Sequence, residues 1–503
     1  MKGNVWRLAF AGLALGICVV SAHQAHSEDL DGRIKTLEQE LADLKTQQVE
    51  MHKEATAAAA ALPSFTYRPG NGLMVESADK GWSVRMGIES HFRMLFESGS
   101  DQVGRTNGEI MGRRFRPYMY YCIDNCLWEL EVILDLDGFG TGNGKNSLNT
   151  ATSSILHRGA LNVHLENLHP WLPTAQLGMD VSASIGTSRQ GSSGVGTQAE
   201  YDLLSRNNGF DDGRSGQGLV LNWDNKPLDA IGIPGRINRF QLAMASVGEA
   251  DDGLSSFTDR KDFVAYLGIE PFSQIKNKWI SGLKFEMGSW FCNRDARQPV
   301  TNACGQLNIQ DLGNGGRQTL WASGPIGDGL ATFLMPGVTW ETGPYTLRVA
   351  GGFQRYEDRA GTAGTTGRKT GNMFLIGHEL FVWSPKGFLT GSANTTGSVL
   401  LGTHFERTDV SCTTAARCSG INNGQFHRDR ILLREWDIYY FVAPRMSIGA
   451  SLLWYDASNL NNAVNGTAQN LGLCNRVTAG ATNCRSGIGG DWVDGQLNFR
   501  YQF

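Results

Sequence analysis

A long alternation of apolar and polar side chains begins near residue 81 and recurs to the end of the chain. Between residues 81 and 96, one face is apolar and the other carries Arg85, Glu89, His91 and Arg93. Segments 127–137, 344–356 and 493–503 repeat the pattern. Because a period of two sustained this long places every second side chain on the same side, the pattern predicts long strands with one apolar and one charged face.

Two architectures could use such strands. A soluble sandwich buries its apolar faces, whereas a membrane barrel turns them to lipid and encloses its polar faces. Sandwich strands are usually about half this length. Very short links such as 123–125, 342–344 and 444–445 also alternate with long connections rich in Gly, Ser, Thr and Asn, which is typical of outer-membrane barrels. We therefore predict a transmembrane antiparallel β-barrel in an all-β domain.

The alternating segments number about sixteen, an even count that suits a barrel. We place them near 81–97, 109–122, 126–137, 155–167, 174–186, 217–224, 235–246, 261–270, 278–291, 330–341, 344–356, 372–383, 397–409, 430–443, 445–457 and 490–503. The barrel domain then spans 81–503. The longest strongly apolar run of the chain, Leu8 to Val20, is shorter than the roughly 20 residues that a membrane-spanning helix needs.

The first 27 residues have the features of an export signal. Lys2 and Arg7 precede the apolar run, and small residues after it offer cleavage sites. The alternative is a buried core helix. Export would carry the chain to an oxidising compartment, where cysteine thiols can pair.

Residues 28–61 are expected to form an α-helical coiled coil in the periplasm. The segment is rich in Glu, Lys, Gln, Leu and Ala, and its seam positions alternate four and three apart: Leu30, Ile34, Leu37, Leu41, Leu44, Gln48, Met51 and Ala55. A heptad seam of nearly four repeats implies self-association, with a trimer plausible, because a lone helix cannot bury it. A monomeric amphipathic helix docked elsewhere is the alternative. Pro63 ends the helix, and 62–80 is expected to be a linker.

Cys18 lies inside the signal, and the other eight cysteines fall into four close couples. We expect each couple to form a local disulfide: Cys122 with Cys126, Cys292 with Cys304, Cys412 with Cys418, and Cys474 with Cys484. A zinc site would need four converging nitrogen or sulfur ligands, and no couple has a His at ligand spacing beside it. We predict no metal and no cofactor.

The charge pattern indicates what the inner wall would present. A formal charge of −4 excludes a dedicated nucleic-acid binder, which needs a strongly basic face. On the predicted polar faces, Arg85, Arg93, Arg114, Arg116 and Arg500 would form a basic arc once the barrel closes. Acidic stretches would oppose it, with Glu129, Glu131 and Asp135 on the third strand and Glu435 and Asp437 on the fourteenth. Arcs of guanidinium groups favour anions, although the same charges could simply pair and solvate a wet channel.

The chain resembles the phosphate-selective porin O and P family, including relatives with a periplasmic coiled coil that pass dicarboxylates. The resemblance rests on the signal, the heptads, the stretch Arg113-Arg114-Phe115-Arg116, the "WSPKGFLTGS" turn at 383–392 and the terminal "LNFRYQF". It implies a trimer of sixteen-stranded barrels, each narrowed by an infolded loop. That loop would be 187–216, which carries Arg206 and Arg214; an external flap is the alternative. The nearly balanced wall charges depart from a phosphate-selective pattern.

The predicted function is an outer-membrane porin of a Gram-negative bacterium, which passes small solutes through a water-filled channel and prefers anions such as phosphate or small carboxylates. Small zwitterions, outer-membrane lipid and further copies of the chain are the other expected partners. An outer-membrane receptor or adhesin with disulfide-clipped loops and no open pore is the alternative. A barrel enzyme is less favoured, because the histidines are scattered and no Gly-x-Ser-x-Gly elbow occurs.

Overall fold

The computed structural model of the 503-residue chain describes most of the strands predicted above and the helix that precedes them. The described residues are 27–68, 72–98, 106–134, 136, 156–183, 214–247, 262–294, 308–311, 318–322, 329–358, 368–384, 396–412, 428–443, 446–456 and 491–502. The chain divides into two compact units, Met1–Pro63 and Ser64–Phe503. Each unit is considered by itself.

The first unit contains one long helix, α1, which runs from Ser27 to Ala61 over 35 residues. Its seam residues Leu37, Leu41, Leu44 and Met51 are 55–63% exposed. A helix that leaves such a seam exposed is what self-association requires. The association of several helices, and hence the coiled coil, stays a prediction. None of the described helices is long and apolar enough to cross a membrane.

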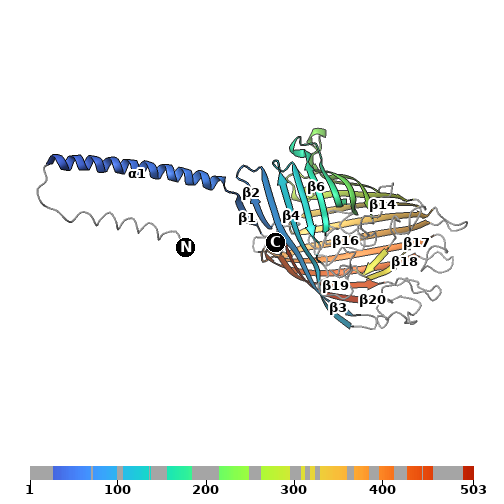
Figure 1. The fold of residues 1–503 in the computed structure, drawn as a ribbon. Helices are drawn as coiled ribbons and strands as arrows, with labels where there is room; N and C mark the ends of the chain where they lie inside the picture. The colour runs from blue at the N-terminus through green and yellow to red at the C-terminus, as the bar shows by residue number, and fades with distance from the viewer. Residues whose placement is uncertain are drawn as a thin grey trace. The chain divides into compact units, whose positions relative to one another are not determined.

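The second unit is a closed antiparallel barrel of sixteen strands (Figure 1). The strands in order are β3 (Trp82–Ser98), β4 (Thr106–Ile123), β5 (Trp128–Leu134), β6 (Leu156–His164), β7 (Thr174–Ala183), β8 (Arg214–Pro227), β9 (Arg236–Val247), β10 (Asp262–Glu270), β11 (Leu283–Arg294), β14 (Gly329–Thr342), β15 (Tyr345–Asp358), β16 (Arg368–Trp383), β17 (Val399–Cys412), β18 (Arg428–Ala443), β19 (Met446–Asp456) and β20 (Asp491–Gln502). Each pairs with the next, and β20 pairs with β3. All sixteen predicted segments overlap these strands.

Four further strands lie within segments for which the sequence predicted none. β1 (Ser64–Arg68) and β2 (Gly72–Glu76) form a hairpin inside the expected linker. β2 pairs with residues 83–86 of β3, just beyond the part of β3 that pairs with β20. The hairpin therefore continues the wall where β20 ends. β12 (Asn308–Asp311) and β13 (Gln318–Ala322) form a separate hairpin between β11 and β14.

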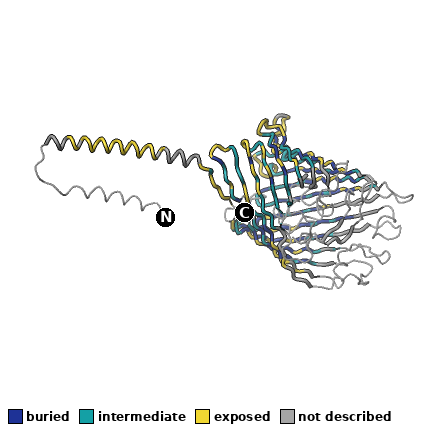
Figure 2. The backbone as a smooth tube through the Cα atoms, in the orientation of Figure 1, coloured by how far each residue is buried: buried dark blue, intermediate teal, exposed yellow. Residues whose placement is uncertain are grey.

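The two faces of the wall are opposite in polarity to those of a soluble protein. On β3, His91 and Arg93 are 2% and 1% exposed, whereas Phe92 and Met94 are 47% and 38% exposed. On β11, Glu286 is buried between the exposed Phe285 and Met287. Figure 2 shows buried and exposed residues along the strands. The described strands confirm the predicted alternation, and their apolar faces point away from the enclosed side.

Aromatic side chains gather where the outward faces reach the short turns. The set comprises Trp82, Tyr121, Trp128, Trp223, Trp340, Tyr345, Tyr440 and Tyr501, each within the first or last few residues of its strand. Amphipathic aromatic rings are enriched where a membrane meets water. Such a girdle is a recurring feature of membrane barrels.

Connections at the two ends of the barrel differ in length. At the girdle end, two residues separate β14 from β15 and two separate β18 from β19. At the opposite end, residues 135–155, 184–213 and 457–490 connect consecutive strands of the wall. This asymmetry agrees with the prediction from the sequence. The loop predicted to fold into the lumen, 187–216, lies outside the described residues except for 214–216, which belong to β8.

Candidate functional site: the inner wall of the barrel

The inner wall is the candidate site because antiparallel pairing and alternation bring polar side chains from all sixteen strands to one enclosed surface. Curvature makes that surface concave, so side chains can reach past a neighbouring strand. Two clusters on it contain five of the ten predicted selectivity residues. We call them the Glu131 cluster and the Asn498 cluster.

The Glu131 cluster joins four adjacent strands, β4 to β7, near the short turns. The Glu131 carboxylate accepts hydrogen bonds from Tyr120 at 3.4 Å, Arg158 at 3.2 Å, Asn162 at 3.4 Å and Gln176 at 3.1 Å. Its side chain is 6% exposed, while that of Arg158 is 19% exposed. Burying a carboxylate is costly unless donors surround it, and here four donors do so.

Arg85 extends this cluster towards β3. Its guanidinium carbon lies 4.3 Å from the centre of the Tyr120 ring, a cation–π contact. Arg85 is exposed, unlike the other members. Its positive charge is therefore available to water and solutes on the enclosed side.

Glu129 connects the cluster to the turn between β6 and β7. It accepts a hydrogen bond from Asn162 at 3.0 Å, and His164 lies 3.9 Å from it. His164 is also 2.9 Å from Glu166, which belongs to the 3-10 turn η1 (Leu165–Asn167) and accepts from Thr174 at 2.6 Å. Burial would raise the pKa of Glu166, but the hydrogen bonds from Thr174 and His164 outweigh it and lower that pKa.

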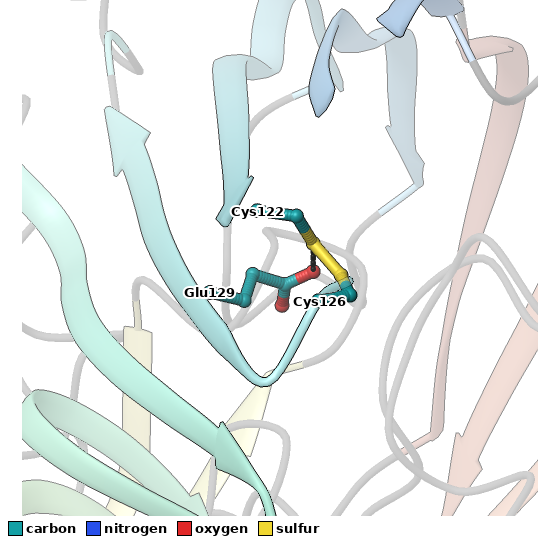
Figure 3. A group of neighbouring side chains, drawn as sticks. All are labelled: Cys122, Cys126 and Glu129. Atoms are coloured by element: carbon teal, nitrogen blue, oxygen red, sulfur yellow. Dashed lines mark hydrogen bonds between the residues drawn. A yellow bond between two sulfur atoms is a disulfide. The ribbon is translucent and has the colours of Figure 1, made fainter. Parts of the chain in front are cut away.

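A disulfide between Cys122 and Cys126 closes the turn from β4 to β5 beside Glu129 (Figure 3). These three residues form the one group of three potential metal ligands found together among the described residues. Because both sulfur atoms are bonded to each other, neither offers the thiolate that zinc binds. The pairing predicted for this couple is confirmed.

The other predicted disulfides fall mainly on the long connections. Cys292 on β11 is buried and disulfide-bonded, and Cys412 is the last residue of β17. Cys304, Cys418, Cys474 and Cys484 lie outside the described residues. The pairings of these three couples therefore stay predictions.

The Asn498 cluster crosses the seam at which the barrel closes. The side-chain oxygen of Asn498 on β20 lies 3.1 Å from His91 Nε2 and accepts from Arg93 Nε at 3.1 Å, both on β3. Its amide nitrogen donates to Tyr439 on β18 at 3.3 Å. Arg500 donates to the same hydroxyl at 2.7 Å, with its guanidinium 4.4 Å from the ring centre. A single neutral amide thus links both sides of the seam.

Gly449 makes the Tyr439 contact possible. Tyr439 on β18 reaches Asn498 and Arg500 on β20 by passing over β19, where it faces Gly449 and its hydroxyl lies 3.5 Å from Ser451 Oγ. A Cβ atom at 449 would collide with the Tyr439 ring. All five members of the cluster are at most 9% exposed.

The structure divides the predicted selectivity residues into four groups. Arg85, Arg116, Glu129 and Glu131 lie on the enclosed face of the first three strands, and Arg93 and Arg500 are buried in the Asn498 cluster. Arg114 and Arg214 lie within β4 and β8, but their side chains are not among those described. Asp135 and Arg206 lie outside the described residues. The predicted basic arc is thus divided between an exposed and a buried part.

Sequence reasoning missed most partners of these residues. Arg239 pairs with Asp224 at 2.8 Å, and Lys284 with Glu286 at 2.9 Å. Glu286 also accepts from Tyr266 at 2.5 Å and Thr339 at 3.0 Å. On β17 and β18, His404 lies 3.4 Å from the predicted wall residue Asp437. The period of two places each of these on the inner face; the cross-strand register, which the sequence does not give, decides the partners.

Comparisons with known proteins give likeness of fold only. The chain matches no family model and no curated protein. Among solved structures, the anion-selective porin from Comamonas acidovorans is 11% identical, with a TM-score of 0.46 over 84% of this chain and 100% of that one. OmpT of Vibrio cholerae is 10% identical (TM-score 0.45; 84% and 98% covered), and the outer membrane channel DcaP of Acinetobacter baumannii 8% (0.44; 84% and 98%). At these values the likeness carries no argument about solutes, so function is argued from this chain's own wall.

Proposed function

We propose that the protein is an outer-membrane porin of a Gram-negative bacterium, through which small solutes diffuse passively. The observation that carries the proposal is the inversion of faces: apolar side chains cover the outside of a closed barrel, and ionised ones line the inside. Hydrocarbon offers no hydrogen bonds to backbone N–H and C=O groups, so only helices and closed barrels, which pair these groups internally, cross a membrane. The apolar outer faces of the strands and the aromatic girdle fit a lipid environment.

The polar interior supports a wet channel. Arg85, Glu129 and Arg158 keep part of their surface open on the enclosed side. Ionised groups are stable there only with partners or water. The barrel is therefore proposed to be a conduit, and an enzyme is not proposed because the histidines are scattered along the sequence.

Preference for anions, such as phosphate or small carboxylates, is the finer part of the proposal. It is supported by the exposed Arg85 and the half-buried Arg116 on neighbouring strands. Membership of the phosphate-selective porin O and P family is proposed on the motifs quoted above. Carboxylates stand beside many of the wall cations, so we expect a modest anion preference and acceptance of small zwitterions, in place of strict phosphate specificity.

A planar bilayer measurement tests this function. Purified protein should give stepwise conductance, and its reversal potential under a salt gradient should favour anions. A potential that favours cations would contradict the anion preference alone. Silent bilayers, obtained with correctly folded protein, would favour the receptor or adhesin with no open pore.

We also propose that α1 assembles a homotrimer through a periplasmic coiled coil, with the signal peptide ending near residue 27. Deleting residues 28–61 should weaken the trimer while conductance persists, because the barrel has its own closed wall. Native mass spectrometry in detergent measures the oligomer. A wild-type protein that is monomeric and stable would overturn this assembly.

A further inference from the structure

Three consecutive turns at the girdle end carry large apolar side chains that remain exposed. They connect β6 to β7 (165–173), β8 to β9 (228–235) and β10 to β11 (271–282), and we call them the rim crown. Leu168 is 65% exposed, Trp171 47%, Ile231 69% and Trp279 66%. The turn from β4 to β5 instead exposes Asp124 and Asn125. Among the described turns at this end, these three share large exposed apolar side chains, and the turn from β4 to β5 does not.

Hydrogen bonds hold the rim crown together as one surface. Lys226 at the end of β8 donates to the carbonyl oxygens of Pro170 and Leu172 in the first turn. The backbone amide of Gln274 donates to Pro234 at 3.2 Å, which joins the third turn to the second. Asn277 caps the short helix α3 (Lys278–Ser281) by accepting from Trp279 at 3.0 Å. The apolar side chains are thus presented on a defined backbone.

Two contacts place the rim crown against the outer face of the wall. The indole of Trp340 on β14 donates to the Trp279 carbonyl at 2.7 Å, and the two rings lie 6.0 Å apart. The indole of Trp223 on β8 donates to the Trp171 carbonyl at 3.1 Å. Trp223 and Trp340 both belong to the outward aromatic girdle. The rim crown therefore continues the girdle beyond the strand ends.

We infer that the rim crown is a lipid-binding surface, whose apolar side chains insert into the membrane leaflet at the short-turn end while Lys276 and Lys278 lie among the phosphate headgroups. Lipid is the occupant because the surface is continuous with the outward apolar wall. Tryptophan with flanking lysine is also the composition found at membrane interfaces. This sector would fix the depth and tilt of the barrel. The inference rests on the proposed membrane location.

Site-directed fluorescence in vesicles of phosphatidylethanolamine and phosphatidylglycerol tests the inference. Single variants Leu168→Cys and Ile231→Cys carry an environment-sensitive label, with the unsubstituted chain as the blank for native cysteines. Phe92→Cys on the outward face of β3 is the lipid-exposed control, and Asp124→Cys the water-exposed control. Labels at 168 and 231 should be quenched by brominated lipid as strongly as the label at 92, and at least threefold less by iodide than the label at 124.

Each other result has a distinct meaning. Iodide quenching equal to that at 124 would overturn the inference and place the rim crown in water. Protection from both quenchers would also overturn it, because a second copy or another protein would then cover the surface. If the label at 92 escapes brominated lipid as well, the porin proposal itself fails.

Discussion

The Glu131 cluster and the Asn498 cluster lie on the same inner wall and were predicted from the same alternation, yet they differ in polarity and exposure. The first gathers donors around a carboxylate and keeps Arg85 in contact with water. The second joins Arg93 and an imidazole to a neutral amide, and Arg500 to the Tyr439 hydroxyl, and it is nearly closed to solvent. We therefore expect an arginine on the inner wall either to act on solutes or to brace the wall, according to how exposed it is.

The largest expected effect follows from removing the hub of the buried cluster. Asn498→Leu removes the acceptor of Arg93 and the donor to Tyr439, so each of these buried side chains loses a hydrogen-bond partner. We expect a loss of about 3 kcal/mol in the free energy of unfolding, measured by urea titration in lipid vesicles. Leu497→Ile is the control on the same strand, because it changes an outward side chain of similar volume and leaves the polar contacts of Asn498 in place. Equal stability of the Leu variant and the wild type would contradict the bracing role.

A second test acts on the same cluster through the backbone. Gly449→Ala places a methyl group where the Tyr439 ring lies, so the ring must move away from Asn498 and Arg500. Overpacking of this kind typically costs about 1–3 kcal/mol. Ala450→Val, on the outward face of the same strand, controls for added volume on β19. If Gly449→Ala unfolds no earlier than this control, Tyr439 does not depend on Gly449.

The third test separates the two arginines that the sequence placed in one arc. Arg85→Ala should lower the anion-to-cation permeability ratio by about 1.4- to 5-fold, because an exposed charge contributes about 0.2–1 kcal/mol, while the folded barrel keeps its stability. Arg93→Ala should instead destabilise the barrel. The measurements are the reversal potential and the resistance of the folded form to heating in detergent. The opposite outcome for the two variants would reverse the assignment of roles.

The smallest effect concerns the turn beneath the Glu131 cluster. Because the pKa of Glu166 is lowered in the folded state, its stabilising contribution is present above its ordinary pKa and is lost as pH falls through the lower folded value. Thr174→Val removes one donor, so we expect the Glu166 pKa to rise towards its ordinary value. The stability that Glu166 contributes above that value should then shrink, and its loss on the acid side should end at higher pH. The free energy of unfolding, measured at several values between about pH 3 and pH 7, gives this change. Ser83→Ala on β3 is a control away from Glu166.

Alternation along the chain was enough to predict all sixteen barrel strands and the side to which His91, Arg93, Glu129 and Glu131 point. It sufficed because a strand in a closed wall has only two faces, so the period of two fixes the face. Prediction failed where the pattern was short. The five-residue strands β1 and β2 gain their partners only from the edge of β3 that β20 leaves open.

The sequence by itself determined that the strands turn their apolar faces outward and their charged faces inward, and that a helix precedes the strands. Only the tertiary structure decided that Asn498 bonds to Arg93, 405 positions away, and that Arg85 stays exposed while Arg93 is buried. The physical reason is that the face to which a side chain points depends on the local period of two. Its hydrogen-bond partners and its exposure depend on the cross-strand register and on closure of the barrel wall.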